Sequence, residues 1–189
     1  YRGQTALMWA VAGSSVEVVE FLIRNKAEVD ARSTVNDWGN QITSEPRAQY
    51  RPAGGLTALL YATRSGCLEC ARLLLKAGAD INRPTPEGVT PLMNAIDNNG
   101  YEIANLLLDQ GANPHISDWW GRTALYLAVD MRTRGTGRGA AAEFRSAEGA
   151  TPRQPQASAL LMAQRLLVLG VNPNTQLNMH WPFRGRFAD

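Results

Sequence analysis

One phrase recurs four times along this chain, and its spacing constrains the fold more than any other feature. The copies read GQTALMWAVA from residue 3, GLTALLYATR from residue 55, GVTPLMNAID from residue 88 and GRTALYLAVD from residue 121. Their threonines are Thr5, Thr57, Thr90 and Thr123, so the last two steps are 33 residues and the first is 52, or 33 plus 19. Such a period predicts stacked units that bury their apolar faces against one another.

A second phrase closes each copy. It reads KAEVDA from residue 26, AGADIN from 77, QGANPH from 110 and LGVNPN from 169. The step from Asn113 to Asn172 is 59 residues, or 33 plus 26, so the fourth copy contains an insertion of its own. We therefore predict repeats at 1–32, 52–84, 85–117 and 118–176, with insertions at 33–51 and 131–156. Residues 177–189 would begin a further insertion or repeat.

The residue types within each copy predict a short helix, a second helix and a glycine turn. Each threonine can cap a helix, and Pro91 suits the first helical position after Thr90. The apolar positions predict buried faces at Leu7, Trp9, Ala10, Leu59, Leu60, Ala62, Leu92, Ala95, Leu125, Leu127 and Ala128 in the first helices. In the second helices they are Val18, Val19, Phe21, Leu22, Leu73, Leu74, Ile103, Leu106, Leu107, Met162, Leu166 and Leu167. Gly78, Gly111 and Gly170 would end three of the second helices in a left-handed turn.

These phrases resemble the ankyrin repeat, whose motif runs roughly G-x-T-P-L-H-x-A-A and ends in G-A-D-x-N. The resemblance covers the chain outside the two insertions. It implies an all-α, helix-turn-helix solenoid of about four repeats with short hairpin turns. Two departures stand out: Met8, Leu60, Met93 and Tyr126 replace the family histidine, and Lys26 replaces the glycine that ends the second helix. Neither end looks like a polar cap, which favours a slice of a longer array.

Composition excludes several classes of function. The chain has 189 residues, 44% of them hydrophobic, with a net charge of +2, so no overall field points to nucleic acid. No apolar run is long enough for a membrane span, and no signal peptide is visible. With two cysteines and two histidines, most metal and acid–base sites are excluded, and we expect no cofactor and no catalysis.

Cys67 and Cys70 form a Cys-x-x-Cys at a helix start, where thiolates are stabilised. A redox role is the alternative, but no thioredoxin-like pattern surrounds them. Cys70 occupies a position where the repeats place a buried valine or isoleucine, and Cys67 one where they place histidine. We favour small buried hydrophobes. His115 takes the place of the asparagine that closes the family motif, which favours a structural role in the turn.

The insertions differ in composition. Residues 33–51 carry Trp38 among polar residues and should project from the hairpin edge, beside the concave face. Residues 131–156 hold five arginines, two glutamates and six glycine or proline residues, which predicts a flexible basic loop. A solvated tether is favoured over an anion-binding arm.

Trp119 and Trp120 lie at a predicted hairpin tip. The resemblance implies that hairpin tips and the ends of first helices line a concave partner-binding face. The candidate partner-binding residues are Trp119, Trp120, Arg122, Trp38, Arg64, Leu56, Glu87, Val89, Asp97 and Asn98. Tryptophan and arginine are enriched in binding hot spots. The competing interpretation is that the tryptophans pack on the neighbouring hairpin as a staple.

Together these features predict a non-catalytic module for protein–protein interaction or scaffolding. A permanent structural subunit of a larger assembly and a redox module using Cys67 and Cys70 are the alternatives. The expected partner is a protein, without nucleic acid and without membrane insertion. Resemblance to insertion-bearing bacterial ankyrin proteins favours an exported or periplasmic chain over a cytoplasmic one.

Overall fold

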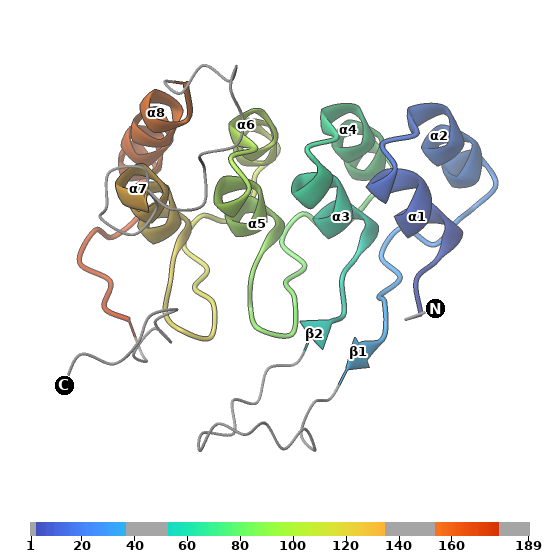
Figure 1. Cartoon of the computed structure of the whole chain (residues 1–189), viewed down its shortest axis with the longest axis horizontal. Coiled ribbons are helices and arrows are strands. Elements are labelled where there is room, and N and C mark those ends of the chain that lie inside the picture. The colour runs from blue at the N-terminus through green and yellow to red at the C-terminus, as the bar shows by residue number, and fades with distance from the viewer. Residues whose placement is uncertain (1–2, 37–52, 135–153, 178–189) are drawn as a thin grey trace, which may run out of the picture.

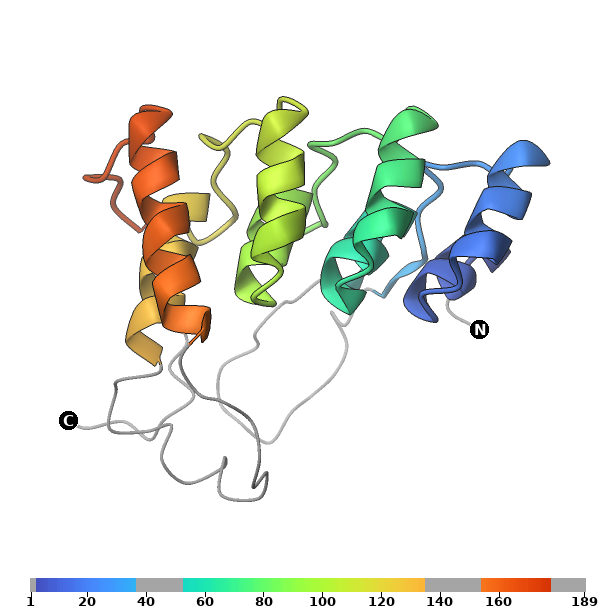
Figure 2. The same cartoon turned by 90° about the horizontal axis from the view of Figure 1, so that it is seen from above.

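The computed structural model describes residues 3–36, 53–134 and 154–177. Within them, four helix pairs stack side by side (Figure 1). Each pair has one helix in an inner row (α1, α3, α5, α7) and one in an outer row (α2, α4, α6, α8). In Figure 2 the outer row lies in front of the inner row. The predicted all-α repeat solenoid is confirmed. No helix among the described residues is long and apolar enough to cross a membrane.

The helix boundaries follow the repeat. The inner helices are α1 Ala6–Ala12, α3 Ala58–Ser65, α5 Pro91–Asp97 and α7 Ala124–Arg134. The outer helices are α2 Val16–Arg24, α4 Leu68–Lys76, α6 Tyr101–Asp109 and α8 Gln154–Val168. Two short strands, β1 Val35–Asn36 and β2 Ala53–Gly54, pair antiparallel below α3.

The predicted caps are present. The hydroxyls of Thr5, Thr57, Thr90 and Thr123 each accept a hydrogen bond from the backbone N–H three residues later, at 3.3–3.4 Å. The turn after α2 is the exception among the second helices, because Lys26 adopts φ 62° where the other repeats place glycine. A side chain in this region is strained by about 1–2 kcal/mol.

The core runs between the two rows of helices and continues from repeat to repeat. Most of the predicted core is confirmed: Leu59, Leu74, Leu92, Leu107 and Leu166, for example, are almost completely inaccessible to solvent. Four assignments are wrong, because Trp9, Val18, Phe21 and Leu167 are all exposed. These residues belong to the first and last of the described repeats, each of which has a described neighbouring repeat on one side only.

The described residues give some detail at the borders of the two predicted insertions. Ser33 donates its backbone N–H to Leu56 O at 3.0 Å, as Thr85 does to Val89 and Asp118 to Arg122. Ser33 therefore occupies the position that Thr85 and Asp118 hold in the third and fourth repeats. Residues 37–52 of the insertion lie outside the described residues. In repeat four, α7 runs to Arg134 and α8 starts at Gln154, so both helices extend into the predicted loop 131–156. The rest of that loop lies outside the described residues.

Candidate functional site

Hairpins project from the inner row of helices and form the lower edge of the molecule (Figure 1). In the third repeat, Thr85 and Val89 close the hairpin through Thr85 N–H to Val89 O at 2.9 Å. In the fourth repeat, Asp118 and Arg122 make the same bond at 3.0 Å. The repeated geometry sets the tip residues of successive hairpins at equivalent positions along one edge.

Adjacent hairpins are joined to each other. Trp119 N–H donates to Glu87 O at 2.9 Å, across the boundary between the third and fourth repeats. Gly88 has φ 85°, and a Cβ there would lie 3.0 Å from the Asp118 Cα, so the close approach requires glycine. The tips of the third and fourth hairpins are therefore held against each other.

Asp118 organises the fourth hairpin. Its Oδ1 accepts hydrogen bonds from the backbone N–H groups of Trp120 and Arg122, at 3.0 and 2.9 Å. Its Oδ2 accepts from Nε and Nη2 of Arg122, both at 2.6 Å. Both side chains are buried, and charge-assisted bonds of this kind are stronger than neutral ones. The sequence offered a signal for this pair, an acid and a base four residues apart across a turn.

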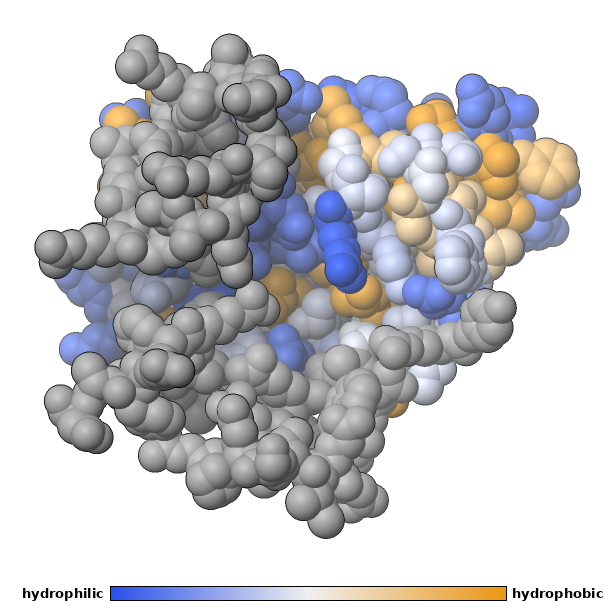
Figure 3. Space-filling model, in the orientation of Figure 1, coloured by the Kyte–Doolittle hydropathy of each residue, from blue (hydrophilic) through white to orange (hydrophobic). Residues whose placement is uncertain are grey.

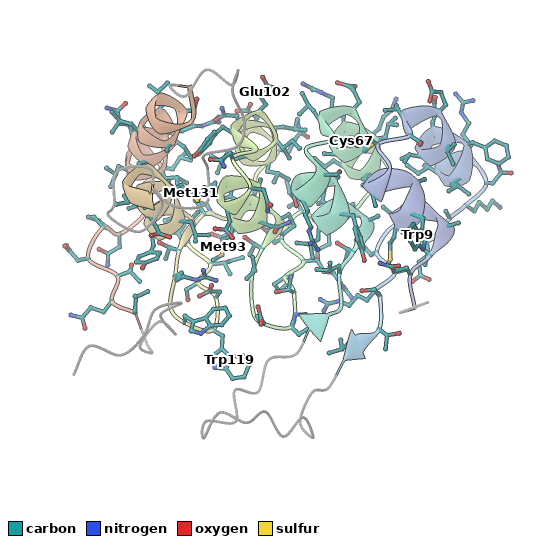
Figure 4. The ribbon with its side chains drawn as sticks, in the orientation of Figure 1. Trp9, Cys67, Met93, Glu102, Trp119 and Met131 are labelled. Carbon is teal, nitrogen blue, oxygen red and sulfur yellow. A yellow bond between two sulfur atoms is a disulfide. The ribbon has the colours of Figure 1, made fainter. Side chains whose placement is uncertain are left out.

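The two tryptophans occupy different environments. The Arg122 guanidinium carbon lies 4.7 Å from the centre of the Trp120 ring, and Trp120 is half-buried. Trp119 is 44% exposed and extends from the hairpin tip away from the helices (Figure 4). The prediction that Arg122 contributes to an exposed face is wrong, because its guanidinium is buried between Asp118 and Trp120.

The other candidate residues lie in the hairpins and at the ends of the inner helices. Arg64 at the end of α3 and Asp97 and Asn98 at the end of α5 are exposed. Leu56, Glu87 and Val89 in the hairpins are half-buried. Trp38 lies outside the described residues.

Groups suited to covalent or metal chemistry are sparse in the described part of the chain. Cys67 and Cys70 are joined by a disulfide and are both buried at the start of α4, so the expected burial is confirmed. His115 donates its backbone N–H to Asn113 Oδ1 at 2.9 Å in a turn. Burial raises the pKa of Tyr101, on α6 and away from the hairpins. No cluster of three or more histidine, cysteine or carboxylate ligands occurs in the described segments.

Comparisons with known proteins agree with this geometry. A family model described as "Ankyrin repeats (3 copies)" matches residues 39–118, and one described as "Ankyrin repeat" matches residues 2–34. A putative ankyrin repeat protein of Acanthamoeba polyphaga mimivirus is 30% identical over 120 residues, which are 61% of this chain and 72% of the viral protein.

Two further relatives are much longer than this chain. The B-cell lymphoma 3 protein homolog of Mus musculus is 43% identical over 75 residues, which are 39% of this chain and 17% of the mouse protein. A putative ankyrin repeat-containing protein of Treponema pallidum is 34% identical over 123 residues, 65% of this chain and 35% of that protein. The chain thus spans only a minor part of these two relatives.

Proposed function

Because the chain belongs to the ankyrin repeat family, we propose that it is a non-catalytic module that binds a protein partner through its hairpin tips and first helices. The observation that carries the proposal is Trp119, which is 44% exposed at the tip of a hairpin. Large exposed aromatic side chains are frequent anchors of protein interfaces.

The bonds that hold the third and fourth hairpins support this function. The bond from Trp119 N–H to Glu87 O fixes one tip against the next, and the buried Asp118–Arg122 pair fixes the fourth hairpin internally. A surface that is ordered before binding loses little conformational entropy when a partner docks. Arg64, Asp97 and Asn98 add exposed polar groups beside the tips, suited to the rim of an interface.

The experiment is a comparison of Trp119→Ala with the unchanged chain in affinity capture from native lysate, followed by titration of the captured protein. We expect the variant to bind at least about 30-fold more weakly, which corresponds to roughly 2 kcal/mol or more for a hot-spot residue. Glu102→Ala is the matched control, since Glu102 is exposed on the outer helix α6. Equal binding by Trp119→Ala and the unchanged chain would overturn the proposed surface.

The redox alternative is less well supported. Thiol–disulfide exchange requires a thiolate to reach one of the two sulfur atoms. Cys67 and Cys70 are both buried at the start of α4, and Cys70 has no exposed surface. A redox role predicts rapid reduction of this disulfide in the folded chain, whereas a structural role predicts reduction only after denaturation. Thiol titration with and without denaturant distinguishes the two.

A permanent structural subunit is the second alternative. It would bury the hairpin row against a fixed neighbour, and the chain would form no stable, monodisperse species alone. A single species that retains its helical circular dichroism would favour the module that binds and releases its partner.

A further inference from the structure

The backbone of Trp119 is held both by its own hairpin and by the hairpin before it. Its N–H donates to Glu87 O at 2.9 Å, which joins it to the third repeat. Within the fourth hairpin, the side chain of the preceding residue, Asp118, accepts from the N–H of the following residue, Trp120, at 3.0 Å. Because the chain is fixed before, at and after Trp119, the direction of its Cα–Cβ bond is fixed as well.

The bond between the two tips depends on the residue type at the position of Trp119. In the third hairpin that position is Pro86, which follows Thr85 as Trp119 follows Asp118. Proline has no backbone N–H, so the third hairpin cannot make the equivalent bond to the second. Of these two junctions, only the one that carries the exposed tryptophan has this backbone bond.

Gly88 sets how closely the third and fourth tips approach. It has φ 85°, and a Cβ built on it would lie 3.0 Å from Asp118 Cα and 3.3 Å from Trp119 N. Both of these atoms belong to the backbone, so neither can turn aside as the end of a flexible side chain can. A larger residue at Gly88 would therefore push the fourth tip away and weaken the bond from Trp119 N–H to Glu87 O, since hydrogen bonds weaken with distance.

We propose that Gly88 is a positioning residue for partner binding, because it lets the third hairpin hold Trp119 in the orientation in which the partner meets the indole. The inference rests on the proposed function, since it concerns the same tryptophan. Two repeats together then build the binding surface. Gly88 contributes to affinity through Trp119 and not through a contact of its own, by keeping the anchor ordered before binding.

The polar part of the proposed surface does not depend on this junction. Arg64 lies at the end of α3, and Asp97 and Asn98 lie at the end of α5. Figure 3 shows hydrophilic side chains at the front of these two helices. Since α3 and α5 position those groups, a change at Gly88 displaces the indole and leaves them in place.

The chain offers a closely matched control for the strain of the substitution itself. Gly111, in the turn after α6, has φ 86°, and a Cβ there would meet nothing within 4 Å. Gly88→Ala and Gly111→Ala therefore carry the same cost of a left-handed alanine, but only Gly88→Ala separates the two tips. Circular dichroism verifies that both variants fold. If Gly88→Ala does not, Gly88→Asn and Gly111→Asn replace the pair, because asparagine tolerates the left-handed region better.

The first measurement is hydrogen exchange of the Trp119 amide, followed by NMR in the chain of residues 1–189. This N–H should be protected in the unchanged chain because it is bonded to Glu87 O. Gly88→Ala should raise its exchange rate by about tenfold or more, whereas Gly111→Ala should keep it within about twofold.

The second measurement is the affinity of the same variants for the protein that the unchanged chain captures from native lysate. Gly88→Ala should bind about tenfold more weakly or worse, and Gly111→Ala should stay within about twofold of the unchanged chain. The double variant Gly88→Ala, Trp119→Ala should bind no more weakly than Trp119→Ala alone, because Gly88 acts through the indole.

Equal exchange of the Trp119 amide in Gly88→Ala and Gly111→Ala would mean that Gly88 does not hold the two tips together, and the proposal would fail. It would fail equally if Gly88→Ala kept full affinity while Trp119→Ala did not, or if the two losses simply added in the double variant. Full affinity in Trp119→Ala would contradict the proposed function and the positioning role with it. The exchange measurement would still show whether Gly88 joins the tips, so the two failures are distinguishable.

Discussion

The hairpins of the third and fourth repeats have the same backbone but different chemistry. In the third, the Thr85 hydroxyl accepts from Val89 N–H at 3.1 Å. In the fourth, the Asp118 carboxylate takes the place of that hydroxyl and Arg122 takes the place of Val89. The tip residues change from Pro86 and Glu87 to Trp119 and Trp120.

The same hairpin backbone can therefore be closed in two ways. We call the hydrogen bond of the third hairpin a neutral closure and the buried ion pair of the fourth an ionic closure. In the third hairpin Thr85 contributes one neutral hydrogen bond, and Val89 packs against the hydrophobic core. In the fourth, two buried charges depend on each other, and Trp120 covers the guanidinium. Asp118, Arg122 and Trp120 thus form the packed part of the fourth hairpin, and Trp119 beside them is exposed.

The largest expected effect comes from breaking the ionic closure. Asp118→Ala leaves the Arg122 guanidinium buried without its carboxylate, which should lower the free energy of unfolding by about 3–5 kcal/mol. Urea denaturation followed by circular dichroism measures the loss. A loss below about 1 kcal/mol would mean that Arg122 finds solvent or another acceptor easily.

The control rebuilds the third hairpin within the fourth. The double change Asp118→Thr and Arg122→Val introduces the residues found at Thr85 and Val89 and removes both charges. Because replacing a buried ion pair by apolar residues is often close to neutral, most of the lost stability should return. If the free energy of unfolding did not recover, the two hairpins would differ in more than these two side chains.

A smaller effect is expected at Trp120. Trp120→Ala removes the ring that covers Arg122 and should lower the free energy of unfolding by about 1–2 kcal/mol. Trp119→Ala is the comparison. It should change the free energy of unfolding by no more than about 0.5 kcal/mol because that side chain is largely at the surface. Thermal denaturation of both variants measures which one loses more stability. Equal losses of stability would contradict the assignment of a packing role to Trp120 and an exposed role to Trp119.

The smallest effect is expected in the neutral hairpin. Thr85→Ala removes one neutral hydrogen bond and should lower the free energy of unfolding by about 0.5–1.5 kcal/mol. Thr85→Ser keeps the hydroxyl and should retain most of the free energy of unfolding that Thr85→Ala loses. If Thr85→Ala cost as much as Asp118→Ala, the contrast between neutral and ionic closures would not hold.

Most of the scaffold was predictable because the repeat encodes the same local choices several times. Threonine caps, glycine turns and apolar periodicity depend on neighbours within a few residues, so Thr57, Gly78 and Leu74 could be placed from the sequence. The core assignments failed at Trp9 and Phe21, because the pattern marks which side of a helix is apolar but not whether a neighbour covers it.

The sequence by itself determined the number of helix pairs, their caps and the position of Trp119 and Trp120 at a hairpin tip. The tertiary structure alone decided that Arg122 is buried on Asp118, that Trp120 covers it, and that Cys67 pairs with Cys70. These outcomes depend on distances between side chains and on how neighbouring hairpins approach. The repeat period predicts which edge of the array carries the hairpins. Whether a side chain at that edge is buried depends on contacts between residues that are set only in the folded chain.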